Sequence, residues 1–384
     1  MPNTEADPER TASEREWLRV NQYLRDHRFG LAVRAAGCYP AAARVAGTPL
    51  LARPEWLPAA PIPLADVAAT FHPGGPRPRI TTADVETINP DLFPERPSGT
   101  RYPRHSAVIG ALAPPAVFEN RLTYRLTSAD LVSQHPRLEF TLGRFFDGTD
   151  VGGAAGYEYA AAELGVIDEQ RLRDAIKDPC DLTARPNAMA VGALTLRYDR
   201  DAGTAQFPLH WRDPKLVGHA GGMFQVIPVG IFQPSGEAEW NVAHDFDLWR
   251  GLLREFAEEL LGADEDHGSE TAPVDYDGWP FARRMTDALA DDAPDGARIR
   301  AWCLGLGADP LTFAMDLLTV VVIDAPLYDD LFGTGVTENA EGTVLPLRPF
   351  TEASVADLVG GHPVQAAGAA LLTLALRHRA ALLA

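Results

Sequence analysis

The architecture of this chain is predicted from one stretch, Arg254-Glu255-Phe256-Ala257-Glu258-Glu259-Leu260-Leu261-Gly262. The pattern predicts a helix from about Asp247 to Leu261, after a long apolar run and before an acidic loop. Asp245 is the expected N-cap, because its short carboxylate can accept hydrogen bonds from the free amides of the first turn. Gly262 is expected to end the helix, since glycine readily adopts the left-handed conformation of a C-terminal cap.

The expected helix has two chemically different faces. At about 100° per residue, Glu255, Glu258 and Glu259 fall within one arc of its surface. The other side carries apolar residues at the spacing of a buried stripe, namely Trp249, Leu253, Phe256 and Leu260. The helix is therefore expected to anchor itself by its apolar side and to present three carboxylates and Arg254 elsewhere.

Crowded carboxylates repel one another unless a positive charge lies among them. A hard divalent cation such as Mg²⁺ suits oxygen ligands and can also hold a phosphate. Arg254 can orient one of the carboxylates through a two-pronged hydrogen bond. A solvated acidic face on an ordinary amphipathic helix is the alternative interpretation of the same residues, and the sequence leaves both open.

The run Arg254-Glu255-Phe256-Ala257-Glu258-Glu259 resembles the core of the Nudix box, Arg-Glu-apolar-x-Glu-Glu-x-Gly-apolar. Upstream, Gln225-Val-Ile-Pro-Val-Gly230 is similar to the strand and turn that lead into the box in that family. Gly262 stands one residue later than the box glycine, and Phe246, between two aspartates, occupies the position of the family's upstream glutamate. The resemblance implies an α/β (α+β) fold, a Nudix-like α/β/α sandwich.

The resemblance also implies an activity. Nudix enzymes hydrolyse a diphosphate linkage in a nucleoside diphosphate that is attached to another group. On this basis Mg²⁺, or Mn²⁺, is expected to bind Glu255, Glu258 and Glu259, to neutralise charge on the bridging oxygens and to lower the pKa of a bound water. One carboxylate would take the proton from that water, and Arg254 would position a glutamate. The expected partner is a phosphate-containing small molecule.

A second, wider resemblance covers the chain from about Trp211 to its C-terminus. This part is similar to a domain in actinobacterial proteins that are often labelled helix-turn-helix regulators. The resemblance is carried by the box core and by residues 222–234, 246–249, 276–280 and 376–379. It implies a Nudix-like unit that senses a ligand, with weak or no catalysis. A third alternative is an unrelated α/β protein whose helix merely resembles the box.

Composition restricts the class of protein. The chain has 384 residues, of which 46% are hydrophobic and 23% charged, as expected for a globular protein of one or two domains. Its formal net charge of −19 argues against direct nucleic-acid binding, because phosphate backbones recruit Lys and Arg. Cys38, Cys180 and Cys303 are far apart and are expected to be small buried residues in a reducing compartment. The polar N-terminus and the lack of a membrane-length apolar run predict a cytoplasmic protein.

The order of the segments predicts three regions. Residues 1–12 are expected to be a disordered tail. Residues 13–105 are expected to form a helix and a Pro-rich segment that wraps over the core as extended chain and short helical turns. Residues 106–384 form the expected Nudix-like domain with C-terminal helices.

Periodicity and turn residues predict the individual elements. Strands are expected at 118–126, 138–146, 190–198, 205–211, 223–232, 299–306 and 317–323. Helices are expected at 13–36, 150–164, 168–177, 279–289, 351–359 and 363–383, besides the glutamate helix. Pro208 indicates an edge strand or a bulge, because proline cannot donate a backbone hydrogen bond.

Other side chains are candidates for the same site. His219 can contact a phosphate, and the acidic loop 263–270 can supply further metal oxygens. Trp211, Phe232 and Trp240 can stack on a base. For each of these residues the ordinary alternative is structural: a turn histidine, a solvated loop and core packing.

Overall fold

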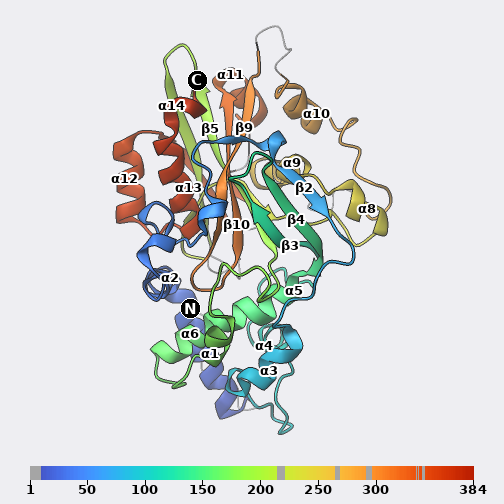
Figure 1. Ribbon diagram of the computed structural model, residues 1–384, viewed down its shortest axis with the longest axis vertical. Helices are drawn as coiled ribbons and strands as arrows, with labels where there is room; N and C mark the ends of the chain where they lie inside the picture. The colour runs from blue at the N-terminus through green and yellow to red at the C-terminus, as the bar shows by residue number, and fades with distance from the viewer. Residues whose placement is uncertain are drawn as a thin grey trace.

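The computed structural model describes residues 10–213, 221–263, 269–290, 296–333, 335, 337–339 and 342–384. It confirms a mixed α/β (α+β) architecture. A large sheet runs through the centre, with helices beside it and a group of helices from the N-terminal half of the chain at one end (Figure 1). Of the helices in the described residues, none is long and apolar enough to cross a membrane.

A nine-stranded sheet forms the centre of the protein. Its main path has the order β1-β9-β10-β5-β6-β12-β11, and the short strands β7 and β8 pair with β6 and β5. The strands are β1 (Ile62–Pro63), β5 (Met189–Asp199), β6 (Thr204–Arg212), β7 (Phe224–Gln225), β8 (Val229–Ile231), β9 (Ile299–Ala308), β10 (Met315–Asp324), β11 (Glu338–Asn339) and β12 (Gly342–Pro349).

The middle of this sheet is apolar and buried. Strand β10 runs parallel to β5, in a register that places Met315 opposite Met189, and antiparallel to β9. From Met315 to Ile323 every residue of β10 is buried, as expected for a strand covered on both faces. The strands predicted at 190–198, 299–306 and 317–323 are confirmed.

The hairpin of β5 and β6 opens into a fork. The two strands pair only next to their turn, where Arg197 lies opposite Gln206 and Asp199 opposite Thr204. Further along, β8 pairs with β5 at Ala190–Gly192, and β7 pairs with β6 at residues 210–211. The β7–β8 segment therefore fills the space between the two strands.

Pro208 lies at a bulge, as its sequence predicted, although β6 is an interior strand. The pairing of β12 with β6 shifts between Leu345 and Arg348, which are opposite Leu209 and Phe207. Two residues of β12 therefore face Pro208, which has no N–H to donate.

The single strand predicted at 223–232 is wrong. The structure has two short strands here, β7 and β8, separated by Val226, Ile227 and Pro228. The peptide carbonyls of the crossing segment are used by β5: the Ile227 oxygen accepts from Thr195 Oγ1 at 2.7 Å, and the Pro228 oxygen accepts from the Ala193 N–H at 2.8 Å. The apolar run 223–232 is therefore not one strand, because the chain crosses at residues 226–228 from its pairing with β6 to its pairing with β5.

A second sheet of three strands has the order β2-β4-β3. Its members are β2 (Ala68–Phe71), β3 (Leu122–Asp130) and β4 (Arg137–Arg144). The strand predicted at 118–126 begins later, at Leu122, and the strand predicted at 138–146 ends earlier, because Phe145–Gly148 forms the short helix α5. Phe118 instead packs its ring against Phe146, with centroids 4.6 Å apart.

The N-terminal helix predicted at 13–36 is present as two helices, α1 (Ala12–Asp26) and α2 (Arg28–Gly37), which meet at His27. Thr11 and Glu14 form a capping box at the start of α1. These helices share a second hydrophobic core with residues of α6 (Ala154–Glu163) and α7 (Arg171–Ile176). A π-helical turn, Thr149–Gly153, precedes α6.

The Pro-rich segment is built from short elements. It contains 3₁₀ turns, the two short strands β1 and β2, and the seven-residue helix α3 (Thr82–Ile88), and it leads to α4 (His105–Leu112). Its 3₁₀ turns are Ala41–Ala43, Val45–Gly47, Pro54–Trp56, Leu64–Asp66 and Pro90–Leu92. Cys180 and Cys303 are buried as expected, but Cys38 is exposed, because it lies just after the end of α2.

The remaining helices are α8 (Glu239–His244), α9 (Leu248–Leu261), α10 (Pro280–Asp287), α11 (Ala325–Phe332), α12 (Glu352–Gly361), α13 (Ala366–Arg377) and α14 (Arg379–Leu382). Helix α9 packs on β5 and β8, and α13 packs on β5, β9 and β10. Paired residues of neighbouring strands point to the same face, whereas successive residues alternate. Gly230 faces α9, and the row Asp316–Ala190–Ile231, one residue along, faces α13. The two helices therefore cover opposite faces.

Candidate functional site

Helix α9 carries the predicted glutamates and spans nearly the predicted residues. Its N-cap is Asp247, whose Oδ1 accepts from the Arg250 N–H at 2.8 Å. The prediction of Asp245 as the cap is wrong, because that carboxylate is fully buried and bound elsewhere. Gly262 ends the helix with φ of 70°, the left-handed conformation expected of it.

The apolar stripe of α9 anchors the helix as predicted. Leu253, Phe256 and Leu260 are all buried in the main hydrophobic core. Trp249 is only half-buried, and its indole Nε1 donates to Thr286 Oγ1 of α10 at 3.1 Å. The stripe therefore fixes which face of the helix the glutamates occupy.

Arg254 is buried, and its charge interacts with Glu255 as well as with groups outside the helix. Its guanidinium donates to the Tyr276 hydroxyl and, at 2.6 Å, to the Gln233 carbonyl, and it lies 3.6 Å from Asp245 Oδ1. Burial opposes its charge, but Tyr276 and Asp245 outweigh burial and raise the pKa of Arg254. Asp245 is thus a carboxylate partner of Arg254 that the sequence did not predict, in addition to the electrostatic attraction of Glu255.

Asp245 is the centre of this buried network. Its Oδ2 accepts from the Ser235 N–H at 2.8 Å and from Ser235 Oγ at 2.5 Å, while Oδ1 accepts from the Tyr276 hydroxyl at 2.9 Å. Burial raises the pKa of Tyr276, so the phenol remains a donor. Asp245 thus ties the loop before α9 to the helix and to the segment after it.

Phe246 takes part in an aromatic cluster. Its ring lies 5.0 Å from the ring of Tyr124 and 5.4 Å from that of Phe71, and it also contacts Phe140 and Phe232. Phe246, at the position where the Nudix family has a glutamate, is therefore part of an apolar cluster. Of the two flanking aspartates, Asp247 caps α9 and Asp245 contacts Arg254.

Two of the predicted glutamates converge on strand β8. A Cβ atom added to Gly230 would lie 1.9 Å from the Glu255 carboxylate carbon and from both of its oxygens, so this carboxylate occupies the space that glycine leaves. Glu259 Oε1 accepts from the Val229 N–H at 2.9 Å. One turn of α9 is therefore joined to two successive residues of the strand.

Glu259 also reaches the other side of the fork. Its Oε2 lies 3.6 Å from Nδ1 of His210, a fully buried residue of β6. Glu259 itself is only 5% exposed, whereas Glu255 and Glu258 are half-buried. The three carboxylates are thus in different environments, and the shared open acidic face predicted for them is wrong for Glu259.

The described residues contain no group of three or more His, Cys, Asp or Glu side chains arranged to hold a metal ion. Glu255, Glu258 and Glu259, the predicted metal ligands, therefore do not form such a group in the part of the chain that the structure describes. Their donor chemistry nevertheless suits Mg²⁺, which is often bound through one or two carboxylates together with waters and substrate phosphates. Glu255 and Glu258 meet that requirement in number and in ligand type.

The other predicted candidates are dispersed. His219 and residues 264–268 of the acidic loop lie outside the described residues. Phe232 is buried in the aromatic cluster, and Trp211 packs against Phe224 with ring centroids 4.8 Å apart. Trp240 is 46% exposed, and its Nε1 donates to the Ser269 carbonyl at 3.2 Å. Among the described aromatic candidates Trp240 is thus the most exposed, whereas Trp211 is half-buried.

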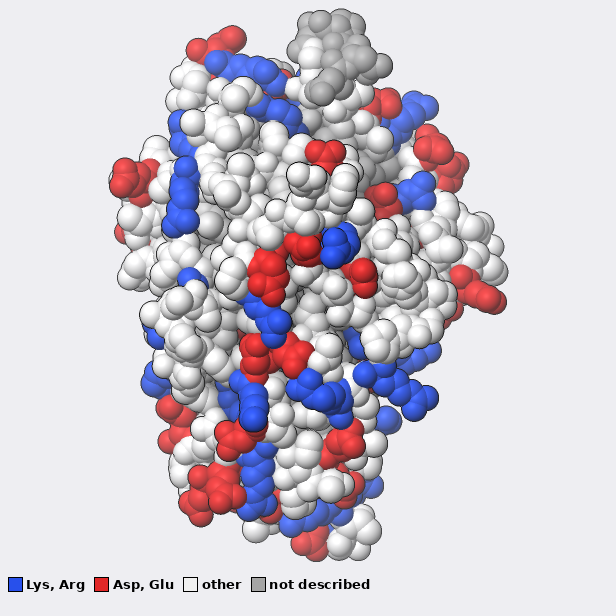
Figure 2. All heavy atoms as spheres, viewed as in Figure 1, with Lys and Arg blue, Asp and Glu red and all other residues white. Residues whose placement is uncertain are grey.

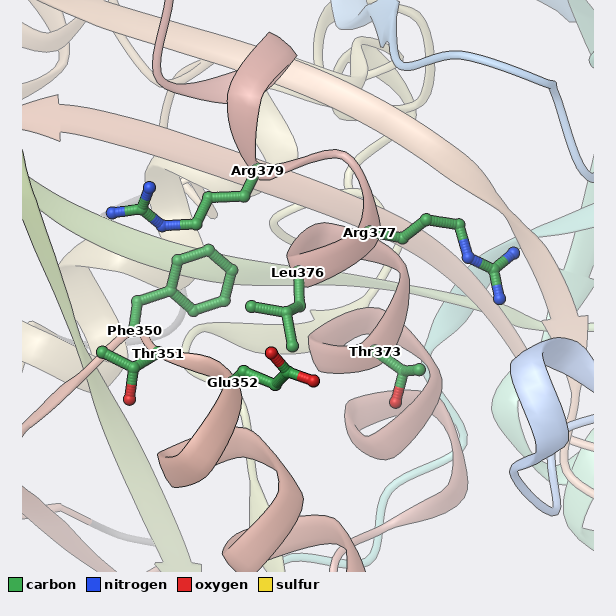
Figure 3. A pocket seen from close by; sticks show the side chains of 7 residues that line it. All are labelled: Phe350, Thr351, Glu352, Thr373, Leu376, Arg377 and Arg379. Carbon is green, nitrogen blue, oxygen red and sulfur yellow. The ribbon is translucent and has the colours of Figure 1, made fainter.

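Two cavities lie away from the glutamates. One, of about 600 Å³, lies between the start of α12 with the two residues before it, the second half of α13 and the first residue of α14 (Figure 3). It is lined by Phe350, Thr351, Glu352, Thr373, Leu376, Arg377 and Arg379. The other, of about 410 Å³, is lined by Arg284, Asp287, Arg298, Pro326, Leu327 and Asp330. In the first, the Arg377 side chain points away from Leu376 and Phe350 (Figure 3).

The surface shown in Figure 2 carries acidic and basic side chains interspersed over the whole face. No family model matches the chain, and no curated protein matches it. Three important residues of the site were missed from sequence: Asp245 as a buried partner, Tyr276 and His210. The strand pattern around His210 was visible, but its contact with a glutamate 49 positions away has no local sequence signal.

Proposed function

We propose that this protein is a Mg²⁺-dependent hydrolase of the Nudix type, which cleaves a diphosphate linkage in a nucleoside diphosphate-linked or other organic diphosphate. The observation that carries the proposal is the convergence of Glu255 and Glu259 on Val229 and Gly230 of β8. Glu255 and Glu259 belong to the box core, and Val229 and Gly230 to the strand that resembles the one leading into the box.

Each residue of α9 has a distinct part in this proposal. Glu255 and Glu258 hold the cation, with Glu259 able to contribute only the oxygen that does not accept from Val229. When bound, the cation neutralises charge on the bridging oxygens and lowers the pKa of a water. Arg254 acts at a distance, because its contacts with Asp245 and Tyr276 fix the rotation of the helix.

A second function, ligand sensing with weak or no catalysis, is favoured by the environment of Glu259. Its carboxylate joins β8 to β6 and is nearly inaccessible, which leaves two carboxylates for a cation. A phosphate-containing ligand could then bind at α9 without being turned over rapidly. The two functions share a ligand class and differ in whether phosphate is released.

Calorimetric titration with Mg²⁺ and Mn²⁺ tests the proposal, on the wild type and on the Glu255→Gln/Glu258→Gln variant. Glu86→Gln, an exposed glutamate of α3, is the control. We expect cation binding that is lost only in the double variant, followed by release of phosphate or of a monophosphate from nucleoside diphosphate compounds. Binding without release supports sensing. The absence of binding both with and without an organic diphosphate contradicts both functions.

A further inference from the structure

Asp316 is a buried carboxyl group at the start of β10, on the opposite face of the sheet from the glutamates. It is 5% exposed, and within the described part of the chain its Oδ2 has no hydrogen-bond partner. A buried carboxylate with an unfilled acceptor is unfavourable, because burial removes water without replacing its hydrogen bonds. The protonated form of the group avoids most of that cost.

A second buried acid lies nearby and acts on Asp316. Asp309 follows β9, and its Oδ1 accepts from the Leu311 N–H at 3.1 Å, from the Thr312 N–H at 2.8 Å and from Thr312 Oγ1 at 3.0 Å. Burial, and then repulsion by Asp309, raise the pKa of Asp316 to about 7, against a hydrogen bond from Gln365 that favours the charged form.

The other charged groups of this region are two arginines. Arg28 of α2 is attracted by Asp309 and repelled by Arg212 of β6, and its guanidinium reaches Thr312 Oγ1 at 3.5 Å. Neither arginine appears among the groups that shift Asp316. The charge state of Asp316 therefore depends on its burial, on Asp309 and on Gln365.

Gln365 connects Asp316 to helix α13. Its Oε1 accepts from the Ala367 N–H at 2.6 Å and from the Gly368 N–H at 3.1 Å, and so caps the first turn. Its backbone N–H donates to the carbonyl of Phe224, the first residue of β7, at 2.9 Å. One residue thus joins the start of α13 to β7 through its backbone and to β10 through its side chain.

We propose that Asp316 is a proton-operated contact that holds the start of α13 on the sheet when it is protonated and loosens it when the proton is released to solvent. The loosening follows because the cost of a buried carboxylate beside Asp309 exceeds the gain from its hydrogen bond with Gln365. That cost is relieved when the first turn of α13 moves and admits water. The contact lies in the residue row next to the one that contains Gly230. It does not depend on the proposed hydrolase activity.

The test is the pH dependence of unfolding for the wild type and for Asp316→Asn, with Asp201→Asn, an exposed turn residue, as the control. A group whose pKa is raised by folding stabilises the protein most at low pH and loses that contribution as the pH rises toward the folded value. We expect the unfolding constant of the wild type, divided by that of Asp316→Asn, to rise roughly tenfold per pH unit between about 4.5 and 6.5. A ratio that does not change with pH overturns the proposal.

A second measurement applies even if Asp316→Asn does not fold. Carbon NMR of the folded wild type follows the carboxyl resonance of Asp316, and amide exchange follows Ala367 and Gly368. We expect the carboxyl to titrate near 7 and both amides to exchange faster above that pH, after correction for the intrinsic rate. A carboxyl that titrates near its ordinary value, or amide protection that is unchanged across the titration, overturns the proposal.

Discussion

The carboxylate of Glu255 occupies the space that a side chain at Gly230 would need. A Cβ atom at position 230 would be 1.9 Å from that carboxylate, which is closer than any real contact. The colliding atoms belong to the flexible end of Glu255, so the glutamate and not the backbone of β8 would give way. Gly230 therefore determines where Glu255 can lie.

Gly230→Ala is expected to move Glu255 off β8 while the fold persists. We expect a change of less than about 1 kcal/mol in the free energy of unfolding, because only a side-chain end has to rotate. Cation binding at α9 should weaken at least tenfold. Gly360→Ala in α12, where an added Cβ meets nothing within 4 Å, is the matched control. Equal cation affinity in the Gly230→Ala variant would contradict the role of Glu255.

Arg254→Met is expected to destabilise the protein by about 3–5 kcal/mol, because it leaves the Asp245 carboxylate buried without its cationic partner. Tyr276→Phe, which removes a neutral donor from the same carboxylate, should cost about 1–2 kcal/mol. Urea unfolding of both variants measures the two costs. If the costs were equal, the ion pair between Arg254 and Asp245 would contribute nothing beyond a hydrogen bond.

The two faces of α9 should respond differently to substitution. Leu253→Ala removes a fully buried side chain and is expected to cost about 2–5 kcal/mol. Glu258→Gln alters a half-buried group and should change stability by less than about 0.5 kcal/mol, while it abolishes any hydrolysis. Thermal unfolding and a phosphate-release assay on the same two variants separate these effects. Hydrolysis at the wild-type rate in Glu258→Gln would contradict the proposed ligand role.

His105 is expected to make the protein less stable in acid. Burial lowers the pKa of its imidazole from 6.5 to about 4, among the rings of Trp17 and Tyr157. Because folding depresses this pKa, the contribution is complete above 6.5 and is lost as the pH falls through 4. The stability of the wild type relative to His105→Gln should therefore fall between pH 6.5 and 4, with exposed His135→Gln as the control. The opposite trend, or none, would show that the imidazole is accessible to protons.

Asp316 acts in the opposite direction over nearly the same pH range, because folding raises its pKa. In the wild type the contributions of His105 and Asp316 to the pH dependence of stability would partly cancel. Each contribution therefore has to be measured as the difference in stability between the wild type and the variant of that residue. Equal and opposite slopes in the two differences are the expected result.

Local patterns predicted much of the structure. The stripe of Leu253, Phe256 and Leu260 gave the position and orientation of α9, because helical periodicity is a property of neighbouring residues. The strands β9 and β10 were predicted in the same way from their apolar runs. Local rules failed where two residues of one type compete: both Asp245 and Asp247 can cap a helix, and only the buried donors Ser235 and Tyr276 decide which one does.

The site itself was only partly predictable. The glutamates of the box core were recognised from sequence. Their surroundings were not, because Glu255 fills the space left by the absent side chain of Gly230, and the partners of Glu259 come from two different strands. Helix α11 was missed although its buried residues Leu327, Tyr328, Leu331 and Phe332 have helical spacing, because it is only eight residues long. Strand β12 was missed because Pro346 interrupts its short apolar run. These features depend on tertiary pairing, which a single sequence does not display.

Because Glu259 contacts both strands of the fork between β5 and β6, the loss of activity in a Glu259 variant would not identify it as a catalytic residue. The Val229 N–H lies where the hairpin has opened and donates to the Glu259 carboxylate on α9, and the same carboxylate approaches His210 on the opposite strand. Replacing Glu259 would leave a main-chain amide unsatisfied and release the two prongs from one another. A Glu259 variant would thus be inactive whether the residue is a metal ligand or has a purely structural role. Mutational scans of this protein can therefore assign catalysis only from Glu255 and Glu258.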